Sequence, residues 1–119
     1  MGYKKNKKYN LLIDRAVEFI LTRNIDELAT LTEKKIAENL KVKPFYLQET
    51  FETERNIALE RFITREKIHR AVFILEKNQL LSVEEISNKL GFSRSDDFVM
   101  EFREYLAIDP HKYKELVAP

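Results

Sequence analysis

The chain has 119 residues, 44% of them hydrophobic and 34% charged, which suits one compact soluble domain or two very small ones and no membrane-spanning segment. It has no cysteine, and its two histidines, His69 and His111, lie far apart, which excludes a disulfide scaffold and a thiolate metal site and argues against a helix-borne zinc pair. The formal net charge is +1, but four lysines precede residue 10 and leave the remainder at −3, so the charge balance alone gives no support for nucleic-acid binding.

The first segment, 1–9, shows no apolar periodicity, and its charge comes from Lys4, Lys5, Lys7 and Lys8. We predict a flexible basic arm there, whose role as a solubilising tail or as a phosphate-binding arm stays open. The segment lacks the apolar run of a signal peptide, and no later stretch has the roughly 18 apolar residues of a membrane helix. We therefore expect a cytoplasmic protein with no membrane partner.

Helices are predicted through the rest of the chain, because it has only 2 glycines and 3 prolines and is rich in the helix formers Leu, Glu and Lys. Apolar residues three and four apart predict a first helix over 11–23, and a loop is predicted over 24–31. Thr32 can cap a short second helix that ends at Leu40, and Pro44 fits the first position of a third helix.

The longest apolar pattern spans 58–77, which as a helix is roughly 30 Å long and could join two small lobes. Its apolar stripe is interrupted by Glu66 and Lys67. We predict that these two residues mark the place where a connecting helix crosses a gap between the lobes.

Three shorter helices are predicted after this connector. Ser82 and Glu85 form a capping box for the first, which ends where Gly91 can adopt a left-handed conformation. Ser93 can cap the next helix, and the dipeptide Asp109-Pro110 can cap and open the last. The sequence thus predicts an all-α protein of seven helices.

Part of this pattern occurs twice. At a constant offset of 50, Ile36, Ala37, Leu40, Val42 and Lys43 fall on Ile86, Ser87, Leu90, Phe92 and Ser93. At an offset of 51, Leu47 and Phe51 fall on Phe98 and Phe102. The shared unit is a short helix, a tight turn and a second helix with apolar residues four apart, which is a helix-turn-helix arrangement.

The two repeats also carry recognisable motifs. The second reads VEEISNKLGFSRS from Val83 to Ser95, followed by Phe98, Phe102 and the segment DPHKY; the first carries Ile36-Ala37, Leu47 and Phe51, and the stretch KIHRAVFIL between them ends at Leu75. In these residues the chain resembles, over about residues 10–114, the DNA-binding domain of the AraC/XylS family of bacterial transcription regulators. The resemblance implies a homeodomain-like fold with two helix-turn-helix subdomains, 10–57 and 78–119, joined by a linker helix over 58–77.

The chain departs from the family pattern at five positions. Family members usually carry Ser where Lys43 stands, Arg where Lys67 stands, Gly where Asn56 and Ala107 stand, and a basic residue where Glu52 stands. Asn tolerates a left-handed conformation, whereas Ala adopts it only at a cost. We expect this to affect the turn at Ala107 and not the fold.

The resemblance further implies a mode of DNA binding. Two recognition helices would lie in successive major grooves on one face of the duplex, about 34 Å apart, so that a monomer reads an asymmetric site. The base contacts are expected from Phe45, Gln48, Glu49, Thr50, Arg94, Ser95, Asp96, Val99 and Met100. The phosphate contacts, which set register without reading sequence, are expected from Lys41, Lys43, Arg103 and Lys112. Gln48 suits adenine and Arg94 suits guanine.

The charge of the recognition helices supports an alternative. The segments 43–55 and 93–104 have net charges of −1 and −2, and acidic helices approach a polyanion unfavourably. A protein-interaction module with weak or lost DNA binding therefore stays open, as do activation or repression, the target promoter and a further domain in a longer chain. RNA polymerase is a further candidate partner. Without a cysteine, paired histidines or a phosphate-binding glycine loop, we expect no enzyme, no cofactor, no metal and no small-molecule site within this domain.

Overall fold

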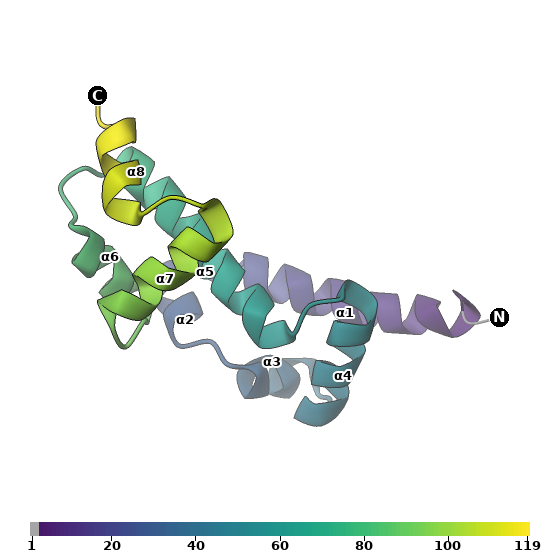
Figure 1. The fold of residues 1–119 in the computed structure, drawn as a ribbon. Coiled ribbons are helices and arrows are strands. Elements are labelled where there is room, and N and C mark those ends of the chain that lie inside the picture. The colour runs from purple at the N-terminus through teal and green to yellow at the C-terminus, as the bar shows by residue number, and fades with distance from the viewer. Residues whose placement is uncertain (1–2) are drawn as a thin grey trace. The chain divides into compact units, whose positions relative to one another are not determined.

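The computed structural model describes the backbone of residues 3–119 and the side chains from residue 11 onward. Regular structure in this range is entirely helical (Figure 1). The helices are α1 (Tyr3–Leu21), α2 (Ile25–Ala29), α3 (Glu33–Leu40), α4 (Pro44–Arg55), α5 (Leu59–Lys77), α6 (Val83–Lys89), α7 (Ser95–Leu106) and α8 (Pro110–Val117). The prediction of an all-α fold is confirmed, with one helix more than the seven expected. None of these helices is long and apolar enough to cross a membrane, within the part of the chain described.

Helix α1 is longer than the sequence predicted. It begins at Tyr3 and so includes most of the segment 1–9 that was expected to be an arm without regular structure. Residues 3–10 contain neither glycine nor proline, and lysine has a favourable helix propensity, so they extend a helix that the following apolar face already supports. Residues 1 and 2 of the predicted arm lie outside the described residues.

The short helix α2 lies where a loop over 24–31 was predicted, and that prediction was wrong. Asn24 Oδ1 accepts a hydrogen bond from the backbone amide of Glu27 at 2.8 Å, and Glu27 Oε1 accepts one from the backbone amide of Asn24 at 3.0 Å. This is a capping box. Leu28, which is fully buried, anchors the single turn. A helix of five residues is too short to show a repeating apolar pattern, so the capping box was the one sequence feature that indicated it.

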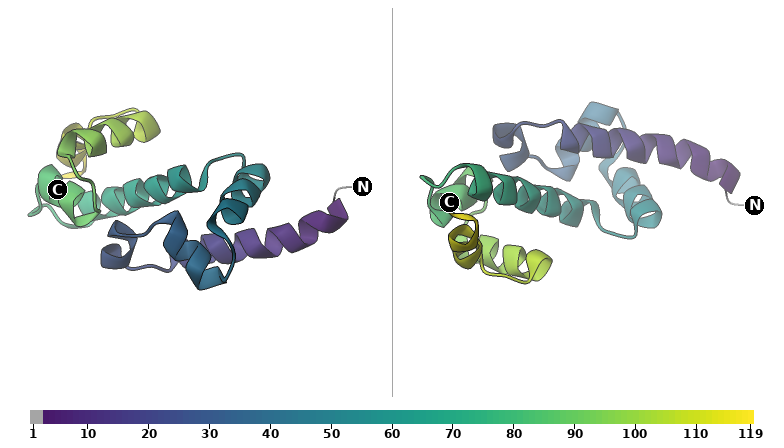
Figure 2. Two further views of the ribbon diagram at one scale, coloured as in Figure 1. Left: turned by 90° about the horizontal axis from the view of Figure 1, so that it is seen from below. Right: turned by 90° about the horizontal axis from the view of Figure 1, so that it is seen from above.

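The chain divides into two compact units. Unit 1 contains the residues up to Arg23 together with Leu31–Ile63, and unit 2 contains Asn24–Thr30 and Thr64–Pro119. Helix α5, the long teal helix in the views of Figure 2, is continuous and contributes its first residues to unit 1 and the rest to unit 2. The long helix predicted over 58–77 is thus confirmed.

In unit 1, α1 packs against α3 and α4, which also pack against each other. The buried hydrophobic residues of this unit are Ile13, Ala16, Ile20, Leu31, Ile36, Ala37, Leu47, Phe51, Leu59 and Ile63. Phe51 meets Phe62 edge to face, with ring centroids 5.3 Å apart. Thr32 and Pro44 begin α3 and α4 as predicted: Thr32 Oγ1 accepts from the Lys35 amide at 3.1 Å, and Pro44 occupies the first turn of α4.

Unit 2 has a core of its own, formed by α5, α6 and α7. Its members are Ile68, Ala71, Leu75, Val83, Ile86, Leu90, Phe98 and Phe102. A row of rings runs through it. The ring centroids of Phe92 and Phe98, of Phe98 and Phe102, and of Phe102 and Tyr113 lie 5.3, 5.8 and 5.9 Å apart, in T-shaped or tilted pairs. The two phenylalanines of α7 therefore face inward, which leaves the opposite side of that helix exposed.

We predicted that Glu66 and Lys67 mark the place where the connecting helix crosses a gap between the lobes, but both residues belong to unit 2. Both side chains are half-buried within unit 2. Lys67 Nζ lies 3.5 Å from the carbonyl oxygen of Ala29 and 5.6 Å from the centroid of the Phe92 ring, and burial lowers the pKa of this lysine. Glu66 is paired with Arg70 Nε at 2.8 Å. These polar groups are accommodated because each finds a partner inside the unit.

Candidate nucleic-acid interface

The turn between α3 and α4 and the turn between α6 and α7 share one backbone geometry. Lys41 and Gly91, 50 residues apart, both have a left-handed conformation, with φ of 60° and 85°. The amide of Val42 donates to the carbonyl five residues earlier at 3.0 Å, and the amide of Phe92 does the same at 3.1 Å. This is the Schellman arrangement that ends a helix in a tight turn. The repeat seen in the sequence is therefore a repeat of structure.

The second helices of the two motifs match as well. Helices α4 and α7 each have 12 residues. They follow Lys43 and Arg94 as N-caps and end in the left-handed residues Asn56 and Ala107, with φ of 56° and 59°. The prediction that Ser93 caps the second recognition helix was wrong: the turn is one residue longer in unit 2, so Arg94 takes the cap position and makes no side-chain cap bond.

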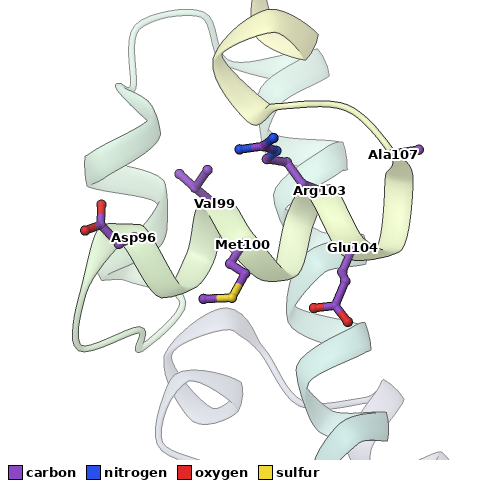
Figure 3. Close-up of a pocket in the computed structure, with 6 residues that line it drawn as sticks. All are labelled: Asp96, Val99, Met100, Arg103, Glu104 and Ala107. Carbon is purple, nitrogen blue, oxygen red and sulfur yellow. The ribbon is translucent and has the colours of Figure 1, made fainter.

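The exposed side of α7 carries most of the residues predicted to touch DNA from unit 2. A shallow groove follows this side and is lined by Asp96, Val99, Met100, Arg103, Glu104 and Ala107 (Figure 3). Met100 is 58% exposed, whereas Ser95 and Val99 are half-buried. The face presents an apolar centre flanked by charges of both signs.

The matching face of α4 is also exposed. Phe45, 67% exposed, and Glu49 project from it, and at an offset of 51 these positions correspond to Asp96 and Met100 of α7. Tyr46, a large and partly exposed side chain next to Phe45, was not among the predicted contacts. The sequence signal for Tyr46 was its position next to Phe45, because two adjacent aromatic side chains exposed at the start of a helix often belong to a binding surface.

Thr50 was predicted to contact bases, and it is the least exposed of the base contacts predicted on α4. The residue is only 8% exposed. It lies three residues after Leu47 and one before Phe51, so the turn of the helix brings it to the buried face of α4. It nevertheless lines a surface pocket with Tyr46, Glu49, Thr53 and Glu54, so its base contact stays a prediction.

Gln48 is held by a residue that the sequence did not single out. Its side chain is half-buried, and its Nε2 donates to Glu33 Oε1 at 2.9 Å. Burial raises the pKa of Glu33, and the nearby Glu60 carboxylate raises it further. No local pattern signals this bond, because Glu33 lies on α3 and Gln48 on α4.

The predicted phosphate contacts Lys41, Lys43, Arg103 and Lys112 are all exposed. Lys112 Nζ lies 3.9 Å from Glu115 Oε1. Arg94, predicted to read guanine, has Nη2 at 3.4 Å from Asp96 Oδ2, with both side chains well exposed (Figure 3 shows Asp96). Solvated pairs of this kind contribute little free energy, so neither prevents the cation from binding phosphate or base.

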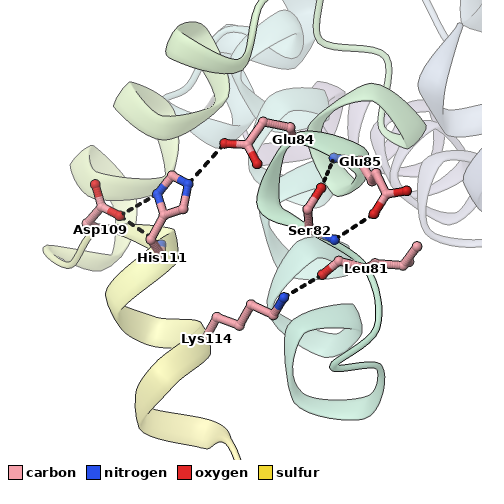
Figure 4. A network of polar contacts seen from close by, with 7 residues as sticks. All are labelled: Leu81, Ser82, Glu84, Glu85, Asp109, His111 and Lys114. Carbon is pink, nitrogen blue, oxygen red and sulfur yellow. Dashed lines mark hydrogen bonds and ion pairs between the residues drawn. The ribbon is translucent and has the colours of Figure 1, made fainter.

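The helix that carries Lys112 is attached to α6 by a polar network (Figure 4). His111 Nε2 lies 3.1 Å from Glu84 Oε2, and His111 Nδ1 lies 3.0 Å from Asp109 Oδ1. Lys114 Nζ donates to a backbone carbonyl of the loop before α6 at 2.8 Å. The hydrogen bond with Glu84 is the largest cause that raises the pKa of His111. In the described part of the chain, no group of His, Cys, Asp and Glu side chains could hold a metal ion.

A family described as a helix-turn-helix domain matches residues 36–115, which include both motifs. The chain belongs to the AraC-type helix-turn-helix family. The family resemblance found in the sequence is thereby confirmed. The family and fold are those of DNA-binding transcription regulators and not those of enzymes.

Three relatives illustrate the AraC-type assignment. The chain is 32% identical over 87 residues to the Msm operon regulatory protein of Streptococcus mutans, an alignment that covers 73% of this chain and 31% of that regulator. A transcriptional regulator with an AraC-type DNA-binding domain from Chromobacterium violaceum superimposes with a TM-score of 0.79, at 22% identity, over 92% of this chain and 94% of that one. The DNA-binding domain of AdpA, a global transcriptional factor solved in complex with a target DNA, superimposes with a TM-score of 0.73, at 18% identity, over 87% and 90%. The C. violaceum and AdpA structures have the same fold as this chain. This chain spans about a third of the length of the Msm regulator.

Proposed function

We propose that this chain binds double-stranded DNA sequence-specifically as part of a transcription regulator, with α4 and α7 in successive major grooves. The observation that carries the proposal is the duplicated motif: two 12-residue helices follow the same left-handed turn, and each buries one face and exposes the other. In such motifs the second helix enters the major groove. The AdpA domain, which shares the fold, was solved with a target DNA.

The proposed base contacts come from the exposed faces of the two helices. On α4 they are Phe45, Gln48 and Glu49. On α7 and its cap they are Arg94, Ser95, Asp96, Val99 and Met100. The apolar side chains suit a thymine methyl group, Arg94 suits guanine, and the carboxylates suit the amino group of cytosine. Lys41, Lys43, Arg103 and Lys112 would bind phosphates.

A second candidate function rests on the negative charge of the two helices. The acidic faces of α4 and α7 would suit a basic protein surface, and RNA polymerase is one candidate partner of a transcription regulator. In this case the chain would be retained weakly on DNA at about 150 mM salt, where the phosphate attraction is strongly reduced. A stable complex with the protein partner would form instead.

Selection of bound sequences from a random duplex pool, at about 50 and about 150 mM salt, separates these functions. We expect an asymmetric consensus with two blocks about ten base pairs apart, one for each recognition helix. The binding constant should fall steeply as salt rises. A pool that shows no enrichment at either salt concentration would contradict the proposal.

Two substitutions then test the roles of single residues. Gln48→Ala should relax one position of the consensus at a cost of about 1–3 kcal/mol, because it removes a base contact. Lys43→Ala should weaken all sequences about equally and lower the salt slope by about 1, because it removes a phosphate contact. Lys77→Ala, at the end of α5 and outside both motifs, is the matched control. It should change neither the consensus nor the salt dependence of binding. Uniform weakening by both Gln48→Ala and Lys43→Ala would refute the assigned roles.

A further inference from the structure

The bond between Gln48 and Glu33 has no counterpart in the second repeat. At the corresponding positions, offset by 50 and 51, unit 2 has Val83 and Val99. Both motifs nevertheless form the same turn and the same pair of helices. The fold therefore does not require a polar pair at this place, and its presence in unit 1 calls for another explanation.

The carboxyl group of Glu33 is held from two sides. Gln48 Nε2 donates to it from α4 at 2.9 Å, and the backbone amide of Glu60, in the first turn of α5, also donates to it. Glu33 and Gln48 are both half-buried. Glu33 thus occupies a defined position between three helices, and Gln48 has an ordered partner at the edge of the exposed face of α4.

This arrangement selects one orientation of the Gln48 amide. A carboxylate accepts hydrogen bonds and donates none, so it faces the amide nitrogen of Gln48 and not the amide oxygen. One N–H of the amide is used in this bond, which leaves the second N–H and the oxygen. Adenine presents one acceptor and one donor in the major groove, and a glutamine pairs with both through one N–H and its oxygen. The remaining groups of Gln48 match this need.

We propose that Glu33 is a positioning residue for base recognition, which holds the Gln48 amide in the orientation that pairs with adenine. The inference rests on the proposed function, since it requires Gln48 to face DNA. It places a determinant of specificity on α3, outside the recognition helix. A fixed amide also loses less conformational freedom on binding than a mobile one.

Two substitutions of Glu33 test this role. Glu33→Gln keeps the size of the side chain but can both donate and accept, so it supports either orientation of Gln48. Glu33→Val copies the residue of the second repeat and removes the bond. Glu38→Gln is the control, because it removes the same charge from an exposed position of the same helix. Circular dichroism and thermal unfolding check that each variant folds.

The measurement is the dissociation constant for four duplexes, made by fluorescence anisotropy. The duplexes carry the selected consensus and differ only at the base pair that Gln48→Ala relaxes. The unsubstituted protein should prefer the duplex with adenine at this position by about 5- to 150-fold, which is the discrimination expected of a good bidentate contact. Both Glu33 variants should lower this preference severalfold, and Glu38→Gln should leave it unchanged. In a Gln48→Ala background, Glu33→Gln should have no further effect on base preference.

The possible failures can be told apart. If the Glu33 variants keep the base preference that Gln48→Ala abolishes, or if they weaken all four duplexes equally, Glu33 has no positioning role, although the proposed function stands. If Gln48→Ala alters no position of the consensus, the inference is overturned because Gln48 does not read DNA. If the natural chain selects no consensus, the proposed function fails and the inference fails with it.

Discussion

Left-handed residues end several of the helices, and they differ in what they demand of the side chain. Gly91 has a φ of 85°, and a Cβ built there would lie 2.1 Å from the carbonyl oxygen of Ala29. This position requires glycine for space as well as for conformation. Asn56 and Ala107 have nearly the same φ, 56° and 59°, but asparagine adopts this region far more readily than alanine. The conformational cost therefore falls on Ala107, and on Lys41 with its φ of 60°, more than on Asn56.

Ala107→Gly should stabilise the protein. The left-handed region costs an L-residue about 1–2 kcal/mol, while the extra freedom of glycine in the unfolded chain costs about 0.4–1 kcal/mol. The net effect should be an increase of about 0.5–1 kcal/mol in the free energy of unfolding, measured by urea denaturation with an unchanged slope. Ala118→Gly is the control, because Ala118 ends α8 with a φ of −63°. An equal gain at both positions would show that the strain at Ala107 is negligible.

Single residues of the site were predictable where their environment is local. The spacing of Leu47, Phe51, Phe98 and Phe102 predicted their burial, and all four are buried. The same spacing places Thr50, which is only 8% exposed, beside the buried face that Leu47 and Phe51 share. The hydrogen bond between Gln48 and Glu33 could not be predicted, because the two residues lie on different helices and meet only after the chain turns between them.

Capping residues made the starts of α3, α6 and α8 predictable. Ser82 and Asp109 accept backbone hydrogen bonds at 3.0 and 2.7 Å from residues two or three positions later, so the whole interaction lies within one short stretch of sequence. Asn24 and Glu27 gave the same signal for α2, but without an apolar pattern behind it. A cap therefore locates a helix from sequence alone when an apolar pattern follows it, whereas the one-turn helix α2 is stabilised by the burial of Leu28 in the folded protein.

The attachment of α8 to α6 should depend on pH. Because its bond with Glu84 raises the pKa of His111, the folded state binds the imidazole proton more tightly than the unfolded chain. This contribution to stability is fully present below the unfolded pKa, near about 6.5, and is lost as pH rises through the higher folded pKa. We expect unfolding experiments between about pH 5.5 and pH 8.5 to show this decline, superimposed on the other titrations.

The variant that isolates this effect is Glu84→Gln, which removes the charged partner seen in Figure 4. It should flatten the decline and lower the pKa of His111, which proton NMR of the imidazole ring measures directly. Glu115→Gln removes an acidic group from α8, the helix that carries His111, without removing a partner of His111, and should preserve both the decline and the pKa. An unchanged His111 pKa in Glu84→Gln would show that this pair does not fix α8.

Over the whole molecule, the two motifs differ in charge. The segment 33–55, which forms α3 and α4, has no net charge, whereas the segment 83–106, which forms α6 and α7, has a net charge of −3. Lys34 and Lys35 begin the first motif where Glu84 and Glu85 begin the second. If both motifs meet DNA, unit 1 should supply most of the electrostatic attraction, because each phosphate neutralised by a cation releases a counterion. Unit 2 would then depend more on contacts with bases.

Neutralising acids on the outward faces should therefore strengthen DNA binding. Glu52→Gln in α4 and Glu104→Gln in α7 each remove one negative charge from an exposed position on a proposed contact face. We expect each to tighten binding roughly fivefold at low salt, about the effect of one close like-charge pair in water, and less as salt screens the charges. Fluorescence anisotropy at about 50 and about 150 mM salt measures the gain in affinity and its decrease with salt.

The same two substitutions decide between DNA and a protein as the partner of the acidic faces. A basic protein surface would lose an attractive contact in each variant, so its complex would weaken, while a DNA complex would tighten. Asp26→Asn in α2, exposed and outside both motifs, controls for the change in overall charge and should affect neither complex. Because the two partners predict effects of opposite sign, unchanged DNA affinity together with a weakened RNA polymerase complex would assign these faces to protein interaction.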